Sequence, residues 1–154
     1  MSTVIIHTDG ASKGNPGDAG IGVVISDQRG RVIGEVSEYI GRATNNVAEY
    51  TALIRGLEEA RRLGASAVRI STDSELLARQ ITGRYRVKSP TLRPLHETLM
   101  RALSEFGEVS VSHVLRDLNA RADRLANDAV RNHRAKDPKH TPPRSDTRQC
   151  RLDL

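Results

Sequence analysis

The chain has 154 residues, 37% of them hydrophobic and only 3% aromatic, so it is long enough for one domain with a core of aliphatic side chains. Its net charge of +5 fits a polyanionic partner, although residues 131–154 carry seven Lys and Arg against three Asp and Glu and therefore hold most of the excess. The single cysteine excludes an intrachain disulfide, and with no apolar run of membrane-spanning length we expect a cytoplasmic protein without a membrane partner.

The first half of the chain predicts three strands followed by a helix. We expect strands over 3–8, 20–26 and 31–40, and a helix over 46–63. The first strand is almost continuously apolar, which is typical of the middle of a sheet. A loop rich in Gly, Asn and Pro is predicted from Gly10 to Gly20, and Gly64 is expected to end the helix.

The second half predicts two more strands and three more helices. We expect a strand over 67–72, a helix over 74–82, an extended basic segment over 84–90, a helix over 92–106, a strand over 109–115 and a helix over 120–132. The apolar periodicity then stops, and prolines and charges predict a basic tail over 133–154. Residues 1–132 should form one α/β domain. Its five-stranded mixed sheet should combine an antiparallel meander with parallel strands and carry helices on both faces.

Two acidic residues come directly after predicted strands. Asp9 follows strand 3–8 and Asp73 follows strand 67–72, so the two carboxylates should lie side by side if these strands are parallel neighbours. Each also has a simpler explanation. Asp9 could be a turn residue before a glycine, and Asp73 could cap the next helix.

Two further acidic residues lie on predicted helices. Glu49 falls on the side of the inward-facing Leu53, where a carboxylate has a desolvation cost unless a cation or hydrogen-bond donors receive it. Alternatively, Asn46 could be the N-cap of this helix, with Glu49 completing a capping box. Asp123 is too far into its helix to be a cap, but it could be a solvated residue or the partner of a neighbouring arginine.

Together the four carboxylates predict a metal site. Carboxylates held close to one another repel and raise each other's pKa unless a cation is present. Oxygen ligands alone select Mg²⁺, Mn²⁺ or Ca²⁺ over Zn²⁺, and the chain has no Cys/His cluster. Two such ions would stabilise the attacking and leaving oxygens at phosphorus, so metal-dependent phosphodiester hydrolysis is expected.

Over residues 1–132 the chain resembles ribonuclease HI in the order and spacing of four motifs. These are DGASKGNPG from Asp9, TNNVAE from Thr44, TDS from Thr72 and ADRLA from Ala122. The resemblance implies the ribonuclease H-like fold. It also implies a monomeric endoribonuclease that hydrolyses the RNA strand of RNA–DNA hybrids and leaves 5′-phosphate and 3′-hydroxyl ends.

The resemblance assigns roles to individual residues as well. It implies that two Mg²⁺ ions, replaceable by Mn²⁺, are bound by Asp9, Glu49, Asp73 and Asp123. His113 has the family's spacing before the last Asp and is a candidate catalytic histidine, or else a strand-end histidine without a catalytic role. Contacts to the minor groove, the RNA 2′-hydroxyls and a DNA phosphate are implied for Gly10, Asn15, Thr44, Asn45 and Asn46.

The segment between 83 and 106 is too short for the basic, Trp-containing helix of longer members, so the chain resembles the short archaeal-type branch. In its place, Arg84, Arg86 and Lys88 alternate along an extended segment and should project to one face that follows phosphates, unless they form a solvated edge. Two alternative functions stay open. One is a non-catalytic hybrid-binding module, which the four acids disfavour, and the other is a nuclease that also acts on double-stranded RNA or RNA–DNA junctions.

Overall fold

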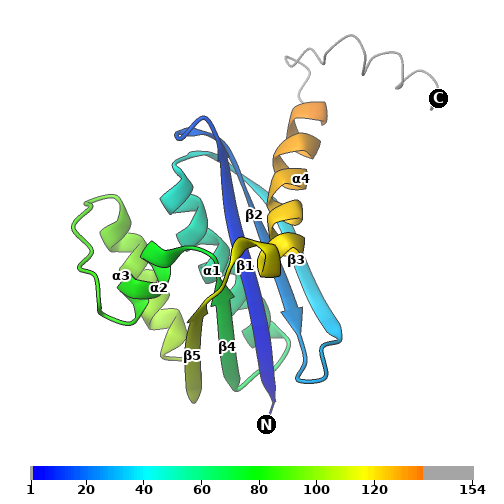
Figure 1. Ribbon diagram of the computed structural model, residues 1–154, viewed down its shortest axis with the longest axis vertical. Helices are drawn as coiled ribbons and strands as arrows, with labels where there is room; N and C mark the ends of the chain where they lie inside the picture. The colour runs from blue at the N-terminus through cyan, green and yellow to red at the C-terminus, as the bar shows by residue number, and fades with distance from the viewer. Residues whose placement is uncertain (1, 137–154) are drawn as a thin grey trace, which may run out of the picture.

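The computed structural model describes residues 2–136, which form one mixed sheet of five strands with helices on both faces (Figure 1). In chain order the elements are β1 (Thr3–Lys13), β2 (Gly17–Ser26), β3 (Val32–Ala43), α1 (Asn45–Arg62), β4 (Ala67–Thr72), α2 (Glu75–Ile81), α3 (Leu92–Leu103), β5 (Glu108–His113), the 3₁₀ turn η1 (Arg116–Asn119) and α4 (Ala120–Lys136). The strand order is β3-β2-β1-β4-β5. Strands β1 to β3 are antiparallel neighbours, and β4 and β5 add in parallel. The predicted fold class is confirmed.

Helices α1 and α4 lie on opposite faces of the sheet because alternate residues of β2 point to opposite sides. Val23 points to α1, where it approaches Gly56, whereas Gly22 touches the backbone of α4 at Ala122. Helix α3 packs against α1 and so thickens the α1 layer. The sheet is therefore covered on one face by α1 and α3 and on the other by α4.

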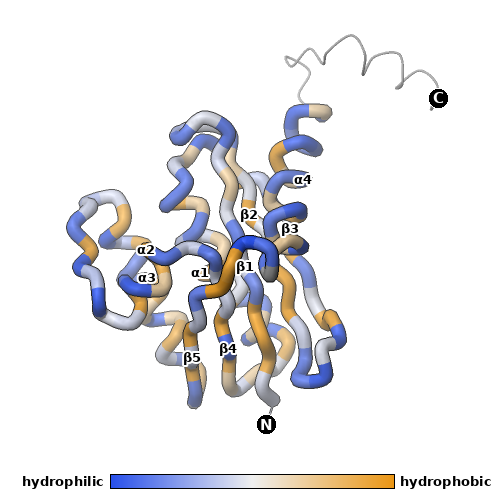
Figure 2. Tube along the Cα trace, in the orientation of Figure 1, coloured by the Kyte–Doolittle hydropathy of each residue, from blue (hydrophilic) through white to orange (hydrophobic). Residues whose placement is uncertain are grey.

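The core is aliphatic, as the composition predicts. Ile6, Val23 and Leu53 are fully buried between the sheet and α1, and Phe106 is the only phenylalanine in the chain. Figure 2 shows the apolar residues gathered along the central strands, while α4 is largely hydrophilic on its outer side. Because these branched side chains are closely packed, the sheet and α1 form a rigid support for the acidic residues that they carry.

The expected loop between Gly10 and Gly20 is wrong. Strand β1 continues to Lys13 and β2 begins at Gly17, so a tight hairpin turn replaces the loop. Backbone pairing runs from Asp9 opposite Gly22 to Lys13 opposite Asp18. Glycine, asparagine and proline indicate a loop by their local preferences, but here the ladder with β2 determines the conformation.

The last helix is longer than predicted, running to Lys136 instead of ending at 132. His133 stacks on Tyr39 with ring centroids 3.5 Å apart, and the Arg134 Nε donates to Asp18 Oδ2 at 2.9 Å. These tertiary contacts hold the final turn, which the loss of apolar periodicity had suggested would unwind. The rest of the predicted tail, from 137 onward, lies outside the described residues.

Three other element ends also differ from prediction by two or more residues. Strand β3 runs to Ala43 and not to 40, helix α3 stops at Leu103 and not at 106, and β5 stops at His113 and not at 115. Among residues 2–136, no helix combines the length and apolar character needed to cross a bilayer.

The contact between Gly22 and α4 yields the first prediction. A Cβ at Gly22 would lie 2.0 Å from the Ala122 carbonyl oxygen and 2.7 Å from the Ala126 nitrogen, so Gly22→Ala must displace the helix. We expect a loss of roughly 2–3 kcal/mol in the free energy of unfolding, measured by denaturant titration. Gly107→Ala is the matched control, since its Cβ would meet only the Ser66 oxygen at 3.6 Å. Equal stabilities of the two variants would contradict this view of the α4 interface.

Candidate metal centre

Two acidic residues lie side by side where β4 ends, because β1 and β4 are parallel neighbours. Thr8 pairs with Thr72, so Asp9 and Asp73 follow at equivalent places on adjacent strands. Asp9 is only 1% exposed and the Asp73 side chain only 4% exposed. The sequence predicted this juxtaposition on condition of parallel pairing, and the structure meets the condition.

Helix α1 brings a third carboxylate to this place, one turn in from its start. Glu49 is 6% exposed, and its Oε1 accepts a hydrogen bond from the Gly10 nitrogen at 3.1 Å. The capping-box alternative for Glu49 is wrong, because Thr44 and not Asn46 is the N-cap: its hydroxyl oxygen accepts from the Val47 nitrogen at 3.2 Å.

Capping does not explain Asp73 either. The N-cap of α2 is Ser74, whose hydroxyl oxygen accepts from the Leu77 nitrogen at 3.2 Å. The Asp73 carboxylate is therefore free to face Asp9 and Glu49 instead of the end of α2.

Gly10 allows α1 to approach β1 closely enough for Glu49 to reach the strand. A Cβ at Gly10 would lie 2.4 Å from the carbonyl carbon of Ala48 and 2.6 Å from the nitrogen of Glu49. Any side chain here would push the helix and its carboxylate away. The glycine in the first motif is thus explained by packing, independently of any ligand.

Three carboxylates meet closely enough to share a cation. One oxygen each of Asp9, Glu49 and Asp73 lies within 4.8 Å of the other two. Asp9 Oδ2 and both oxygens of Asp73 are buried and have no hydrogen-bond partner among the described residues. Buried carboxylate oxygens without a donor are costly, so this cluster fits a divalent metal.

Asp123 approaches the open side of this cluster from the first turn of α4. Its side chain is 37% exposed, and its negative charge is near enough to raise the pKa of Asp9. Arg116 spans the gap, with Nε 3.9 Å from Asp73 Oδ2 and Nη1 3.7 Å from Asp123 Oδ1. The structure therefore brings all four predicted acids together, three buried and one at the solvent boundary.

Burial is the main influence on the protonation of the cluster. It raises the pKa of Asp9 to about 9, helped by a hydrogen bond to Asp123 and repulsion from Glu49 and Asp73. Burial also raises the pKa of Glu49 to about 8, followed by repulsion from Asp73, while the Gly10 N–H acts in the opposite direction. A divalent cation would reverse these shifts, so protons and metal compete for the same oxygens.

His113 ends β5 at the rim of the cluster. It is exposed, and its Nε2 lies 3.3 Å from the backbone carbonyl oxygen of Asp73. The ring thus contacts the backbone of one residue of the cluster, and it also stands at a strand end. Both predicted interpretations of this histidine are compatible with the geometry.

The predicted groove residues form a small network beside the cluster. The Asn45 nitrogen donates to Asn15 Oδ1 at 2.8 Å, and the Ser12 nitrogen donates to Asn45 Oδ1 at 3.2 Å. These bonds tie the β1–β2 hairpin to the start of α1. In these bonds the side-chain oxygens of Asn15 and Asn45 are the acceptors. The side-chain nitrogen of each exposed amide can therefore donate to a ligand. Thr44 and Asn46 lie next to them, also exposed.

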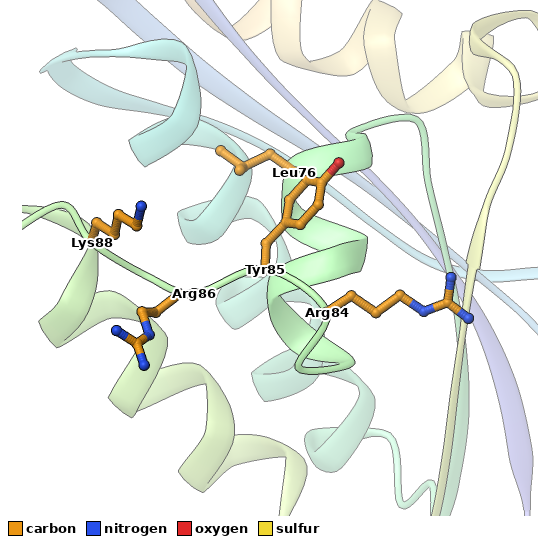
Figure 3. A pocket seen from close by; sticks show the side chains of 5 residues that line it. All are labelled: Leu76, Arg84, Tyr85, Arg86 and Lys88. Carbon is orange, nitrogen blue, oxygen red and sulfur yellow. The ribbon is translucent and has the colours of Figure 1, made fainter.

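The basic segment after α2 lines an open pocket of about 500 Å³. Its lining residues are Leu76, Arg84, Tyr85, Arg86 and Lys88. Figure 3 shows the three basic side chains pointing in different directions: Arg84 extends towards β5, Arg86 extends away from it, and Lys88 follows neither of these directions. The single basic face that we predicted is wrong, because this segment pairs with no strand among the described residues and the two-residue alternation of a sheet does not apply.

Two asparagines around Asp123 were missed by sequence reasoning. Asn119 is 1% exposed, and its Nδ2 donates to the Thr8 carbonyl oxygen at 2.7 Å, which fastens the turn before α4 to the middle of β1. Asn127 donates from its Nδ2 to Asp123 Oδ1 at 3.2 Å. The sequence contains only a weak indication of their roles, namely that each asparagine is four positions from Asp123.

A family model described as reverse transcriptase-like matches residues 7–129. Among curated proteins, the chain is similar to a bifunctional protein of Mycobacterium tuberculosis, with 45% identity over 128 residues, or 82% of this chain and 35% of that protein. The chain thus spans only about a third of the length of this relative.

Solved structures show the same similarity. RNase H1 from the archaeon Halobacterium salinarum superposes with a TM-score of 0.83 at 42% identity, covering 84% of this chain and 98% of that one. LC11-RNase H1, solved in complex with an RNA/DNA hybrid, gives a TM-score of 0.81 at 45% identity, with the same coverage of 84% and 98%.

The raised pKa values predict how stability depends on pH. A carboxyl whose pKa is higher in the folded state stabilises the fold below its ordinary pKa, and that contribution is lost as pH rises through the folded-state value. For Asp9 and Glu49 the loss should extend from about pH 4 to about pH 9 in metal-free protein. Asp9→Asn should therefore raise the melting temperature near pH 8.5 by roughly 5 °C and flatten the profile. Melting curves in chelator check this, and a wild-type protein that gains stability over this range would contradict it.

Proposed function

Since the chain belongs to the ribonuclease HI family, we propose that it is an endoribonuclease that hydrolyses the RNA strand of RNA–DNA hybrids. The observation that carries this proposal is the cluster of Asp9, Glu49 and Asp73, in which three buried oxygens of the two aspartates have no donor among residues 2–136. A related ribonuclease with 45% identity has been solved with an RNA/DNA hybrid, which supports the choice of substrate.

The oxygen-only donor set fits Mg²⁺, with Mn²⁺ as a substitute. Asp9, Glu49, Asp73 and Asp123 would hold two ions, the first three from the buried side and Asp123 from the solvent side. When bound, such ions stabilise negative charge on the attacking and leaving oxygens of an in-line displacement at phosphorus. The protein's own contribution is to keep the four carboxylates in place on a rigid sheet edge.

His113 is suited to proton transfer at the rim. Its exposed ring can reach solvent, and its contact with the Asp73 carbonyl keeps it beside the carboxylates. Supplying a proton to the leaving 3′-oxygen would give the 3′-hydroxyl and 5′-phosphate ends that we propose.

The hairpin network is suited to recognising ribose. The amide nitrogens of Asn15 and Asn45, with the backbone near Gly10, would donate to consecutive 2′-hydroxyls in a wide, shallow minor groove. Thr44 and Asn46 at the exposed start of α1 would contact the sugar-phosphate backbone nearby.

The basic residues after α2 would bind phosphates on two separate sides. Arg84 extends towards β5 and lines a hollow with His113, whereas Arg86 extends away from β5, with Lys88 further along the segment (Figure 3). Because hybrid binding would rest on these charges, its affinity should depend strongly on salt. We propose a monomer acting in the cytoplasm.

Asp73→Asn tests the catalytic assignment. Loss of one carboxylate removes charge from the metal site, so Mg²⁺-dependent cleavage of a labelled RNA–DNA hybrid should fall by roughly a thousandfold while hybrid binding survives. Cleavage near the wild-type rate would refute the assignment. Wild-type protein that binds the hybrid without cutting it would favour a binding module. Cutting of double-stranded RNA or of RNA–DNA junctions in the same assay would identify a broader nuclease.

His113→Ala tests the proton-transfer role. Removal of a general acid should lower kcat by roughly ten- to a hundredfold, with KM little changed because the ring is not part of the proposed binding surface. The melting temperature should stay the same, since the side chain is exposed. An unchanged kcat would show that His113 is only a strand-end residue.

A further inference from the structure

Asp123 differs from the other three acids because it lies outside the buried cluster and needs other groups to orient it. Its side chain is 37% exposed on the first turn of α4, where an unrestrained carboxylate would sample several rotamers. One turn further along the same helix face, Asn127 Nδ2 donates to Asp123 Oδ1 at 3.2 Å and to its backbone carbonyl at 2.8 Å. The Asn127 amide is thus hydrogen-bonded to both the side-chain carboxylate and the backbone carbonyl of Asp123.

Asn127 is itself oriented from the other side. The ammonium group of Lys13, at the end of β1, donates to Asn127 Oδ1. This bond holds the amide with its oxygen towards the hairpin and its nitrogen towards Asp123. A chain of donors therefore runs from Lys13 through Asn127 to the carboxylate, and each bond polarises the next.

We propose that Asn127 is a positioning residue that holds Asp123 ready for the metal, and that Lys13 acts on the metal site through Asn127 and not as a free charge. The proposal rests on the metal-dependent nuclease function proposed above. It adds two residues that contact neither the metal nor the substrate, from two elements far apart in the chain.

The two possible actions of Lys13 have opposite signs. A positive charge near a dication repels it, so if Lys13 acted only through its charge, neutralising it would tighten metal binding. If Lys13 orients Asn127, neutralising it weakens metal binding, because Asp123 is then held less well.

Arg116 is a matched control for charge. It faces Asp73 and Asp123 directly, at 3.9 Å and 3.7 Å, without an intervening amide. Its guanidinium therefore occupies the same side of the carboxylates as an incoming cation. Arg116→Gln should tighten metal binding, the reverse of what we expect for Lys13→Gln.

The experiment is a calorimetric titration of the full chain with Mn²⁺ alone, without nucleic acid. We expect Asn127→Ala to weaken Mn²⁺ binding about tenfold, since loss of a residue that orients a metal ligand costs roughly 10–100-fold in affinity. Lys13→Gln should weaken binding by a smaller factor. In the Asn127→Ala background Lys13→Gln should cause no further weakening, because its route to Asp123 is gone.

Melting curves in chelator separate positioning from folding. Alanine is favourable inside a helix, so Asn127→Ala should melt close to the wild type without metal and gain less stability when Mn²⁺ is added. Asn127→Leu, of similar size but uncharged and unable to donate, serves as a second variant and should also weaken binding.

Three outcomes would overturn the proposal while leaving the nuclease function intact. They are unchanged Mn²⁺ affinity in both Asn127 variants, tighter binding in Lys13→Gln, or equal weakening by Lys13→Gln with and without Asn127. Failure of the wild type itself to bind Mn²⁺ would instead overturn the proposed function and this inference together.

Discussion

The cost of burying three carboxylates next to one another is the constraint on which the rest of the site depends. Asp9, Glu49 and Asp73 come from two strands and a helix, and their packing excludes the water that would otherwise screen them. Apart from the Gly10 N–H, the described residues offer few donors, so buried oxygens stay without partners. Such a cluster is favourable only when it is protonated or bound to a cation, and this makes it a metal site instead of a structural network.

The scaffold supplies the stability that this cluster removes. Aliphatic side chains fill the space between the sheet and α1, and close backbone contacts fix the helices on both faces of β1 and β2. On one face Gly10 admits α1 at Ala48, and on the other Gly22 admits α4. Because Glu49 and Asp123 lie near the starts of these two helices, the glycine contacts determine how near the carboxylates come to Asp9 on β1.

The site is graded from buried to exposed. Asp9 and Glu49 lie inside, Asp123 is at the boundary, and His113 and the hairpin amides face solvent. The buried carboxylates on the rigid sheet can bind a metal ion. The exposed side chains can reach a large polyanionic molecule that could not enter the buried cluster. Lys13 belongs to both regions, since it lies on the hairpin and is bonded through Asn127 to the first turn of α4. The hairpin and the acidic cluster are therefore connected through hydrogen bonds.

Much of the fold and the acidic site could be predicted from the sequence. Apolar periodicity located α1 and strand 67–72, and the acids stood out because each followed or entered a strongly patterned element. Local pattern could not show that β1 runs on through glycines to Lys13, that Tyr39 and Asp18 hold the last turn of α4, or that Thr44 and Ser74 are the caps. Those features come from pairing and contact between residues distant in the chain. The sequence by itself determined which carboxylates could bind a metal, because side-chain chemistry and element ends are local properties. Tertiary structure alone decided how deeply each is buried, which amides orient Asp123 and where the basic side chains point, because these depend on which surfaces meet.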